Sequence, residues 1–333
     1  MPDNPLARRL ITIPLVFVTF LLLTALSPAL LVVGGAIDAT RAIVSGKPWM
    51  TLRSVAFLWV YLLGQVWALL GLLLTVPLPD GMRKEATFRL QSSWTAWNFA
   101  ALRALFSLDL EVDGQDSAKP GPILLLSRHA SMVDTMLPAG LIANPLGIRL
   151  RYVLKKELLV DPTLDIGGSR LPNYFIDRSA TDSAAEIDAI RQLAADLGPG
   201  DGVLIYPEGT RYSEEKRIRY SRRMASDAGI VGQVAAGLRR VLPPRPGGTL
   251  ALLEATSADV VVLAHRGLEG LATVRDIWSG GMVGSRINVL VWRVRRDEIP
   301  NGRRERIEWL YRLWAEVDDW VVAQESVGGP APA

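Results

Sequence analysis

The stretch "PILLLSRHASMVDTMLPAGLIA" (122–143) decides the fold class of this chain of 333 residues. Its first six residues form a short apolar run typical of a buried strand, and residues 132–143 indicate a helix. Strand-like segments and helix-like segments continue to alternate along the rest of the chain. Further strands are expected at 151–155, 173–178, 202–206, 259–267 and 287–296, and further helices at 156–159, 181–200 and 303–324. Alternating strands and helices predict an α/β domain with a largely parallel or mixed sheet covered by helices.

Two apolar runs, 11–37 and 54–79, precede this domain and carry no charge. Each is long enough to cross a bilayer, which takes about 20 residues. A buried core helix is the alternative for either run. A cleaved signal peptide is the alternative for the first, although its length exceeds the usual apolar core of roughly 7–15 residues. We therefore expect an N-terminal two-helix transmembrane hairpin over residues 1–79.

The flanks of the hairpin carry slightly more lysine and arginine than the loop between its helices. The flanking residues are Arg8, Arg9, Arg83, Lys84 and Arg89, and those of the loop are Arg41, Lys47 and Arg53. Because cytoplasmic segments are enriched in these residues, both termini are expected to be cytoplasmic. Beyond the hairpin we expect a connecting amphipathic helix within 80–112, the α/β domain at 113–325 and a disordered tail at 326–333.

The composition excludes several classes of function. The formal net charge is only +3, so a general role in nucleic-acid binding is not indicated. The absence of cysteine excludes disulfides, a thiol nucleophile and thiolate metal sites. Basic residues do gather locally in 211–223 and 238–245. Such a surface is either simply solvated or faces anionic headgroups or a phosphorylated cofactor.

His129, one of two histidines, follows the strand expected at 122–127. The carboxyl ends of strands in α/β sheets are where such folds hold ligands. His129 and Asp134 can meet only if His129 precedes the helix and Asp134 lies in its first turns. Asp134 would then fix the tautomer of the imidazole and leave the other ring nitrogen as a base. The pair alone also fits a packed histidine beside an unrelated surface aspartate.

A second group of residues, "YPEGTR" (206–211), closes another expected strand. Gly209 permits a tight turn, Thr210 presents a hydroxyl, and Arg211 offers a bidentate fork for phosphate or carboxylate. A capped strand-to-helix turn is the alternative reading. A third group, within 155–179, supplies Lys155, Lys156, Arg170 and Arg178 near a further strand end.

In this order and spacing the three groups resemble the membrane glycerolipid acyltransferases, the lysophosphatidic acid acyltransferases and their relatives. His129 and Asp134 match the H-x4-D pair of that family, "FIDRS" (175–179) its second block and "YPEGTR" its third. The resemblance implies transfer of a fatty acyl group from acyl-CoA or acyl carrier protein to a lysophospholipid hydroxyl, foremost that of 1-acylglycerol-3-phosphate. No metal and no bound cofactor are implied.

The resemblance also implies a role for each site residue. His129 would be the general base and Asp134 its orienting partner. The acceptor lipid would be held by Arg178 and Arg211 at its phosphate, with Glu208, Gly209 and Thr210 completing the site. Glu208 would orient an arginine or a glycerol hydroxyl. A bacterial inner membrane with a cytoplasmic catalytic domain is the expected location, and nothing indicates protein partners.

The chain departs from the family pattern at three places. Arg128 stands where the family usually has asparagine, and could lower the proton affinity of His129 or contact a phosphate. The strand at 260–270 lacks the usual Val-Pro and contains His265. The long segment after Arg211, with "VLPPRPGG" (241–248), is similar to a longer-loop branch of less uniform substrates. Other acceptors (lysocardiolipin, lysophosphatidylglycerol), a membrane lipid hydrolase and a non-catalytic membrane-binding module are therefore the alternatives.

Overall fold

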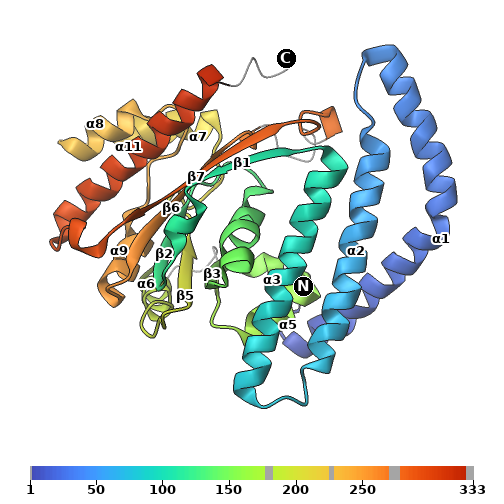
Figure 1. The fold of residues 1–333 in the computed structure, drawn as a ribbon, viewed down its shortest axis with the longest axis horizontal. Coiled ribbons are helices and arrows are strands. Elements are labelled where there is room, and N and C mark those ends of the chain that lie inside the picture. Colours follow the sequence, from blue (N-terminus) through green and yellow to red (C-terminus); the bar gives the residue numbers. More distant parts are fainter. Residues whose placement is uncertain (1, 177–182, 225–228, 270–277, 328–333) are drawn as a thin grey trace. The chain divides into compact units, whose positions relative to one another are not determined.

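The computed structural model describes residues 2–176, 183–224, 229–269 and 278–327 (Figure 1). The chain divides into two compact units. The first comprises Met1–Leu108, Leu154–Ser179 and Arg275–Gly284, and the second comprises Asp109–Val153, Ala180–Val274 and Ser285–Ala333. The second unit contains His129, Asp134 and the "YPEGTR" segment.

Two long helices open the first unit, α1 (Pro5–Ser45) and α2 (Met50–Leu74). Both are long and apolar enough to cross a membrane. The turn between them is built by Gly46, which has a positive φ of 62°, and by the Asp38 carboxylate, which accepts the N–H groups of Met50, Thr51 and Leu52. The hairpin helices are thus present, but the first is longer than its apolar run and the second ends at Leu74.

The rest of the first unit begins with α3 (Asp80–Phe106), which is the expected connecting helix. It also contains η4 (Lys156–Val160), α5 (Pro162–Arg170) and β4 (Tyr174–Ile176). Asp165 of α5 is fully buried and accepts hydrogen bonds from Arg8 and Arg9 at 2.8–3.2 Å. The basic flank of α1 is therefore engaged in an ion pair within this unit.

The sheet is mixed, as predicted. Within the described residues its strand order is β1-β7-β6-β2-β5-β3-β4. The strands not yet given are β1 (Asp109–Asp113), β2 (Ile123–Ser127), β3 (Arg149–Lys155), β5 (Asp201–Ile205), β6 (Asp259–Arg266) and β7 (Arg286–Val294). β2 lies between β5 and β6, runs parallel to both and is buried along its whole length, whereas β6 and β7 are antiparallel.

Helices cover this sheet, and Figure 1 shows α11 (Arg303–Val327), the longest described helix of the second unit, running across it. It packs against β6, α8 (Ile230–Gly237) and α9 (Pro246–Ala255). The other helical segments that the structure describes in the second unit are η1 (Gln115–Ala118), η2 (Asp134–Met136), η3 (Pro138–Ala143), α4 (Asn144–Leu146), α6 (Ser183–Gln192), α7 (Glu214–Met224) and η6 (Arg296–Glu298).

Several elements differ from the sequence prediction. Strand β1 begins inside the range expected for the connecting helix (80–112), because the chain leaves α3 at Ser107 and then pairs with β7. The helix expected at 132–143 is a 3-10 turn followed by a π-helix that begins at Pro138. Helices α7, α8 and α9 fill the segment after Arg211, where no element was predicted. Of the expected tail, 326–327 belong to α11 and 328–333 lie outside the described residues.

Candidate active site

His129 lies two residues beyond the end of β2, in a short irregular segment, and is 9% exposed. Asp134 follows as the first residue of η2. Ser131 brings the two together, since its hydroxyl accepts the N–H groups of Val133 and Asp134 at 3.0 and 3.1 Å and turns the chain back. As a result, His129 Nδ1 lies 3.0 Å from Asp134 Oδ1.

The Asp134 carboxylate is fully buried, and both of its oxygens accept hydrogen bonds. Its Oδ2 accepts the N–H groups of Ala130 and Ser131 at 2.5 and 2.7 Å. Burial acts to raise the pKa of Asp134, but hydrogen bonds and charge interactions with His129 and His265 outweigh it and hold that pKa below its usual range. An ionised Asp134 accepts a hydrogen bond from Nδ1–H of His129, so the lone pair of the neutral ring lies on Nε2.

Glu208 fixes the backbone of the histidine. It is fully buried, with Oε1 accepting the N–H of His129 at 3.0 Å and Oε2 accepting the N–H of Leu242 at 3.1 Å. Burial raises the pKa of Glu208 to about 8, although Arg128 and the two amides favour its charged form. Both oxygens thus contact the main chain, which suits a residue that positions His129 rather than one that reaches a ligand.

The segment after Glu208 is tied to the histidine by its backbone. Gly209 adopts φ +66° and closes a turn through its N–H to the Tyr206 carbonyl at 2.9 Å. The N–H of Tyr212 donates to the His129 carbonyl at 2.7 Å, and the Tyr206 ring packs against the imidazole with centroids 4.6 Å apart. The structure therefore brings the His129–Asp134 pair and the "YPEGTR" segment to one edge of the sheet.

Thr210 and Arg211 are half-buried at this edge. Lys216 of α7 donates to the Thr210 hydroxyl at 3.0 Å and to the Arg211 carbonyl at 2.9 Å. A cation thus lies directly beside the turn that was expected to hold an anionic group.

Arg128 is fully buried, so its guanidinium does not face a solvent-accessible ligand position. It donates to the His265 carbonyl at 2.6 Å, to the Arg240 carbonyl at 2.8 Å and to the Glu269 carboxylate. Burial acts to raise the pKa of Glu269, but the Arg128 charge lowers it to about 2. Arg128 therefore joins the end of β2 to the end of β6 and to the loop before α9.

His265 is also fully buried and lies nearer the pair than its sequence suggests. Its Nε2 is 3.1 Å from the Arg128 carbonyl and 3.5 Å from Asp134 Oδ2. The sequence placed His265 on the strand expected at 260–270 and assigned it no role in the site. The signal that could have found it is the parallel pairing of β2 with β6, which places their carboxyl ends side by side.

We expect Arg128→Met to destabilise the fold, because it leaves two buried carbonyls without this donor and Glu269 without its cationic partner. The loss should be on the order of 2–3 kcal/mol, measured as a fall of roughly 5 °C in the Tm of the detergent-solubilised protein. Arg239→Met is the matched control. Its half-exposed side chain pairs with Asp318 and Asp319, so it should cost less than about 1 kcal/mol. Equal Tm values for the two variants would contradict this role of Arg128.

The third sequence group, within 155–179, is described only in part. Arg178 lies outside the described residues. Arg170 donates to the Thr75 hydroxyl at 2.8 Å and to the Leu72 carbonyl at 3.0 Å, and therefore caps the carboxyl end of α2. Lys156 forms an ion pair with Asp3 at 3.0 Å.

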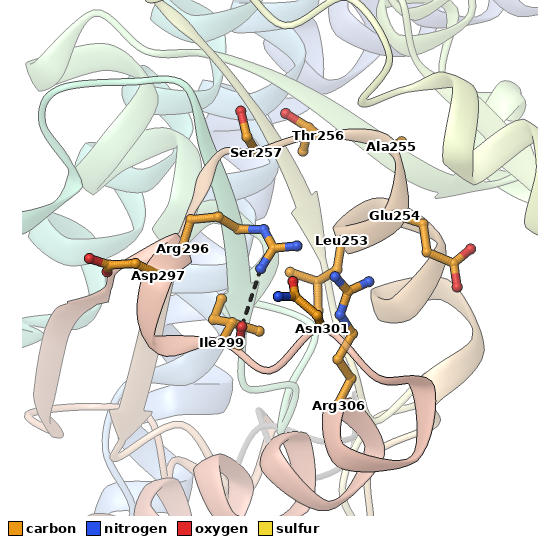
Figure 2. Close-up of a pocket in the computed structure, with 10 residues that line it drawn as sticks. All are labelled: Leu253, Glu254, Ala255, Thr256, Ser257, Arg296, Asp297, Ile299, Asn301 and Arg306. Atoms are coloured by element: carbon orange, nitrogen blue, oxygen red, sulfur yellow. Dashed lines mark hydrogen bonds between the residues drawn. The ribbon is translucent and has the colours of Figure 1, made fainter.

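A surface hollow elsewhere on the second unit contains none of the expected site residues. Figure 2 shows its lining, which comes from the end of α9, from η6 and from the start of α11. Because Ala255–Ser257 precede β6 and Arg296 follows β7, this hollow lies at the edge of the sheet opposite His129. Among the described residues, no group of three or more histidine or carboxylate side chains is arranged to hold a metal ion.

Comparison with known proteins identifies the family to which this chain belongs. A family model described as acyltransferase matches residues 109–264. The lyso-ornithine lipid O-acyltransferase of Pseudomonas aeruginosa is 30% identical over 195 residues, 57% of this chain and 69% of that protein. The chain therefore belongs to the acyltransferase family, and the resemblance to that family is confirmed.

Two further relatives carry the name 1-acyl-sn-glycerol-3-phosphate acyltransferase. The Pseudomonas aeruginosa protein is 30% identical over 172 residues, 50% of this chain. The mouse epsilon protein is 24% identical over 219 residues, 59% of this chain. The matches span 62% and 56% of the length of those relatives.

The fold is shared with a solved structure, the 1-acyl-sn-glycerophosphate (LPA) acyltransferase PlsC from Thermotoga maritima. The TM-score is 0.56 at 14% identity, and the match covers 84% of this chain and 98% of the other.

Proposed function

We propose that this protein transfers a fatty acyl group from acyl-CoA or acyl carrier protein to the free hydroxyl of a lysophospholipid, with 1-acylglycerol-3-phosphate as acceptor and phosphatidate as product. The observation that carries the proposal is the 3.0 Å contact between His129 Nδ1 and Asp134 Oδ1. It directs the lone pair of His129 to Nε2, the one arrangement in which this pair serves as a general base.

The reaction follows from that base. Nε2 of His129 takes the proton of the acceptor hydroxyl as the oxygen attacks the thioester carbonyl. The new C–O bond forms, the C–S bond breaks, and the proton passes from the imidazolium to the departing thiolate. Asp134 stabilises the imidazolium in between. Direct transfer suits a chain without cysteine, in which no thiol can carry the acyl group.

Two features support a phosphate-bearing lipid as the acceptor: cationic side chains near the histidine and helices long enough to cross a membrane. Arg211 and Lys216 lie at the Gly209–Thr210 turn, and Arg178 is expected to join them at the phosphate of the lipid. Two membrane-length apolar helices suit an enzyme whose acceptor and product both reside in a bilayer. We place the protein in a bacterial inner membrane with the second unit on the cytoplasmic side.

A second acceptor is favoured by one specific relative, since a match of 30% identity carries the name lyso-ornithine lipid O-acyltransferase. An ornithine headgroup carries an ammonium group as well as a carboxylate and has no net charge, so a cationic turn attracts it less than it attracts a phosphate monoester. We therefore rank the phosphate-bearing lysolipid first.

A panel of acceptors tests the proposal. Membranes containing the full chain are supplied with labelled acyl-CoA and with lysophosphatidate, lysophosphatidylglycerol, lysocardiolipin or lyso-ornithine lipid. We expect label in phosphatidate at the highest kcat/KM. A higher kcat/KM with another lysolipid would overturn the acceptor, label in free fatty acid alone would indicate a hydrolase, and no turnover of any donor would indicate a binding module.

A further inference from the structure

Arg245 lies against the turn of "YPEGTR", although 34 to 39 positions separate it from that segment in the sequence. Its N–H donates to the Pro207 carbonyl at 2.7 Å. Its side chain runs over Gly209, where an added Cβ would come within 3.0 Å of Arg245 Cδ and 3.4 Å of Nε. The loop before α9 and the turn beyond β5 thus form one surface, and Arg245 is exposed on it.

Tyr220 of α7 holds this guanidinium in place. Its hydroxyl accepts from Arg245 Nη2 at 3.0 Å, and the guanidinium carbon lies 5.7 Å from the centre of the ring. Arg219 approaches the same ring at 5.3 Å. Burial acts to raise the pKa of Tyr220, but the charges of Arg245 and Arg219 outweigh it and lower that pKa. The phenol therefore lies in a positive field.

No carboxylate of the described residues forms an ion pair with Arg245, in contrast to other arginines nearby. Arg217 pairs with Glu214, Arg239 with Asp318 and Asp319, and Arg240 with Glu325. A guanidinium has five N–H donors, and the phenol uses one of them. Arg245 thus presents a positive charge and free N–H donors next to the Gly209–Thr210 turn. The chain just after that turn is hydrogen-bonded to the His129 carbonyl through the N–H of Tyr212.

We propose that Arg245, oriented by Tyr220, is a headgroup-binding residue that selects a terminal phosphate monoester over a phosphodiester or an ornithine headgroup. A monoester carries nearly two negative charges and three free oxygens, enough to engage both Arg211 and Arg245. A diester carries one charge and two free oxygens, so it loses little without the second arginine. This inference rests on the proposed function, because it assigns a ligand to the acceptor side of the same site.

The test compares acceptor kinetics in membranes containing the full chain. Arg245→Ala should raise the KM for lysophosphatidate about 10-fold or more, with kcat and the KM for lysophosphatidylglycerol nearly unchanged. Arg245→Lys keeps the charge without the planar fork and should give an intermediate KM. Arg222→Ala is the matched control, because it removes an exposed charge from α7, the helix that carries Tyr220, and its KM should equal that of wild type. Equal KM values for Arg245→Ala and wild type, or a rise shared by both acceptors, would overturn the selectivity.

A binding measurement separates this inference from the proposed function. The Tm of the detergent-solubilised full chain is followed with sn-glycerol 3-phosphate as the probe, since a ligand that binds only the folded state raises Tm. Wild type should be stabilised and Arg245→Ala should not. If the probe raises the Tm only when Arg245 is present but no acyl transfer occurs, the proposed acyltransferase function is wrong and the phosphate site stands. If acyl transfer occurs but the probe raises the Tm of wild type and Arg245→Ala equally, only the phosphate site at Arg245 is wrong.

Discussion

Replacing His129 by alanine should reduce kcat for acyl transfer by about 10²–10⁴-fold, which is the range of a general base. The variant keeps Asp134 with its two backbone donors and keeps Glu208 with the N–H of residue 129, so the surrounding segment remains held. What disappears is the nitrogen that accepts the proton of the attacking hydroxyl. Initial rates of labelled phosphatidate formation at saturating donor and acceptor measure this effect.

His129→Gln is the sharper companion variant. An amide in the same place can still donate to Asp134 but has no basic nitrogen, so it should be as inactive as alanine. An unchanged Tm for both variants, with unchanged affinity for sn-glycerol 3-phosphate, would assign the loss to chemistry. A His129→Gln variant with more than a tenth of wild-type kcat would contradict a role for this histidine as the base.

The second large effect is expected for Asp134→Asn, with a loss of about 10²–10⁴-fold in kcat and little change in KM. The N–H groups of Ala130 and Ser131 require an oxygen at the position of Oδ2. The amide nitrogen of asparagine must therefore take the position of Oδ1 and donate to His129 Nδ1. The histidine proton is then forced onto Nε2, and the base is lost although every side chain keeps its place.

Two measurements sharpen this prediction. In His129→Ala, adding Asp134→Asn should cost almost nothing further, because the pair acts as a unit. On the acid side of the pH–rate profile, activity should fall with the uptake of one proton, by His129, and not two. Asp134 stays ionised there because its pKa lies below its usual range. Additive losses in the double variant would show that Asp134 acts independently of His129.

The parts of the site that depend on local geometry could be predicted from the sequence. The condition that His129 precede a helix and Asp134 open it follows from helical rotation alone, and the structure meets it with a 3-10 helix. The carboxyl ends of β2 and β5 could be predicted to share an edge because short apolar runs separated by helices favour parallel pairing. The turn at Gly209 could be predicted because a positive φ there favours glycine.

The remaining parts depend on contacts between distant segments. Arg128 is buried because its three acceptors come from His265, Arg240 and Glu269, more than a hundred positions away, and an arginine read alone indicates an exposed charge. Helix α7 is short and strongly basic, so its pattern resembles a solvated loop. The contact of Arg245 with Gly209 exists only once the segment after Arg211 has folded back onto β5.

The most direct test of the central claim is product analysis with the purified full chain, acyl-CoA and lysophosphatidate, with wild type and His129→Ala side by side. We expect phosphatidate and free thiol in equal amounts from wild type, and neither from the variant above the uncatalysed rate. Phosphatidate formed at the same rate by His129→Ala, or thiol released by wild type with free fatty acid in place of phosphatidate, would contradict the account.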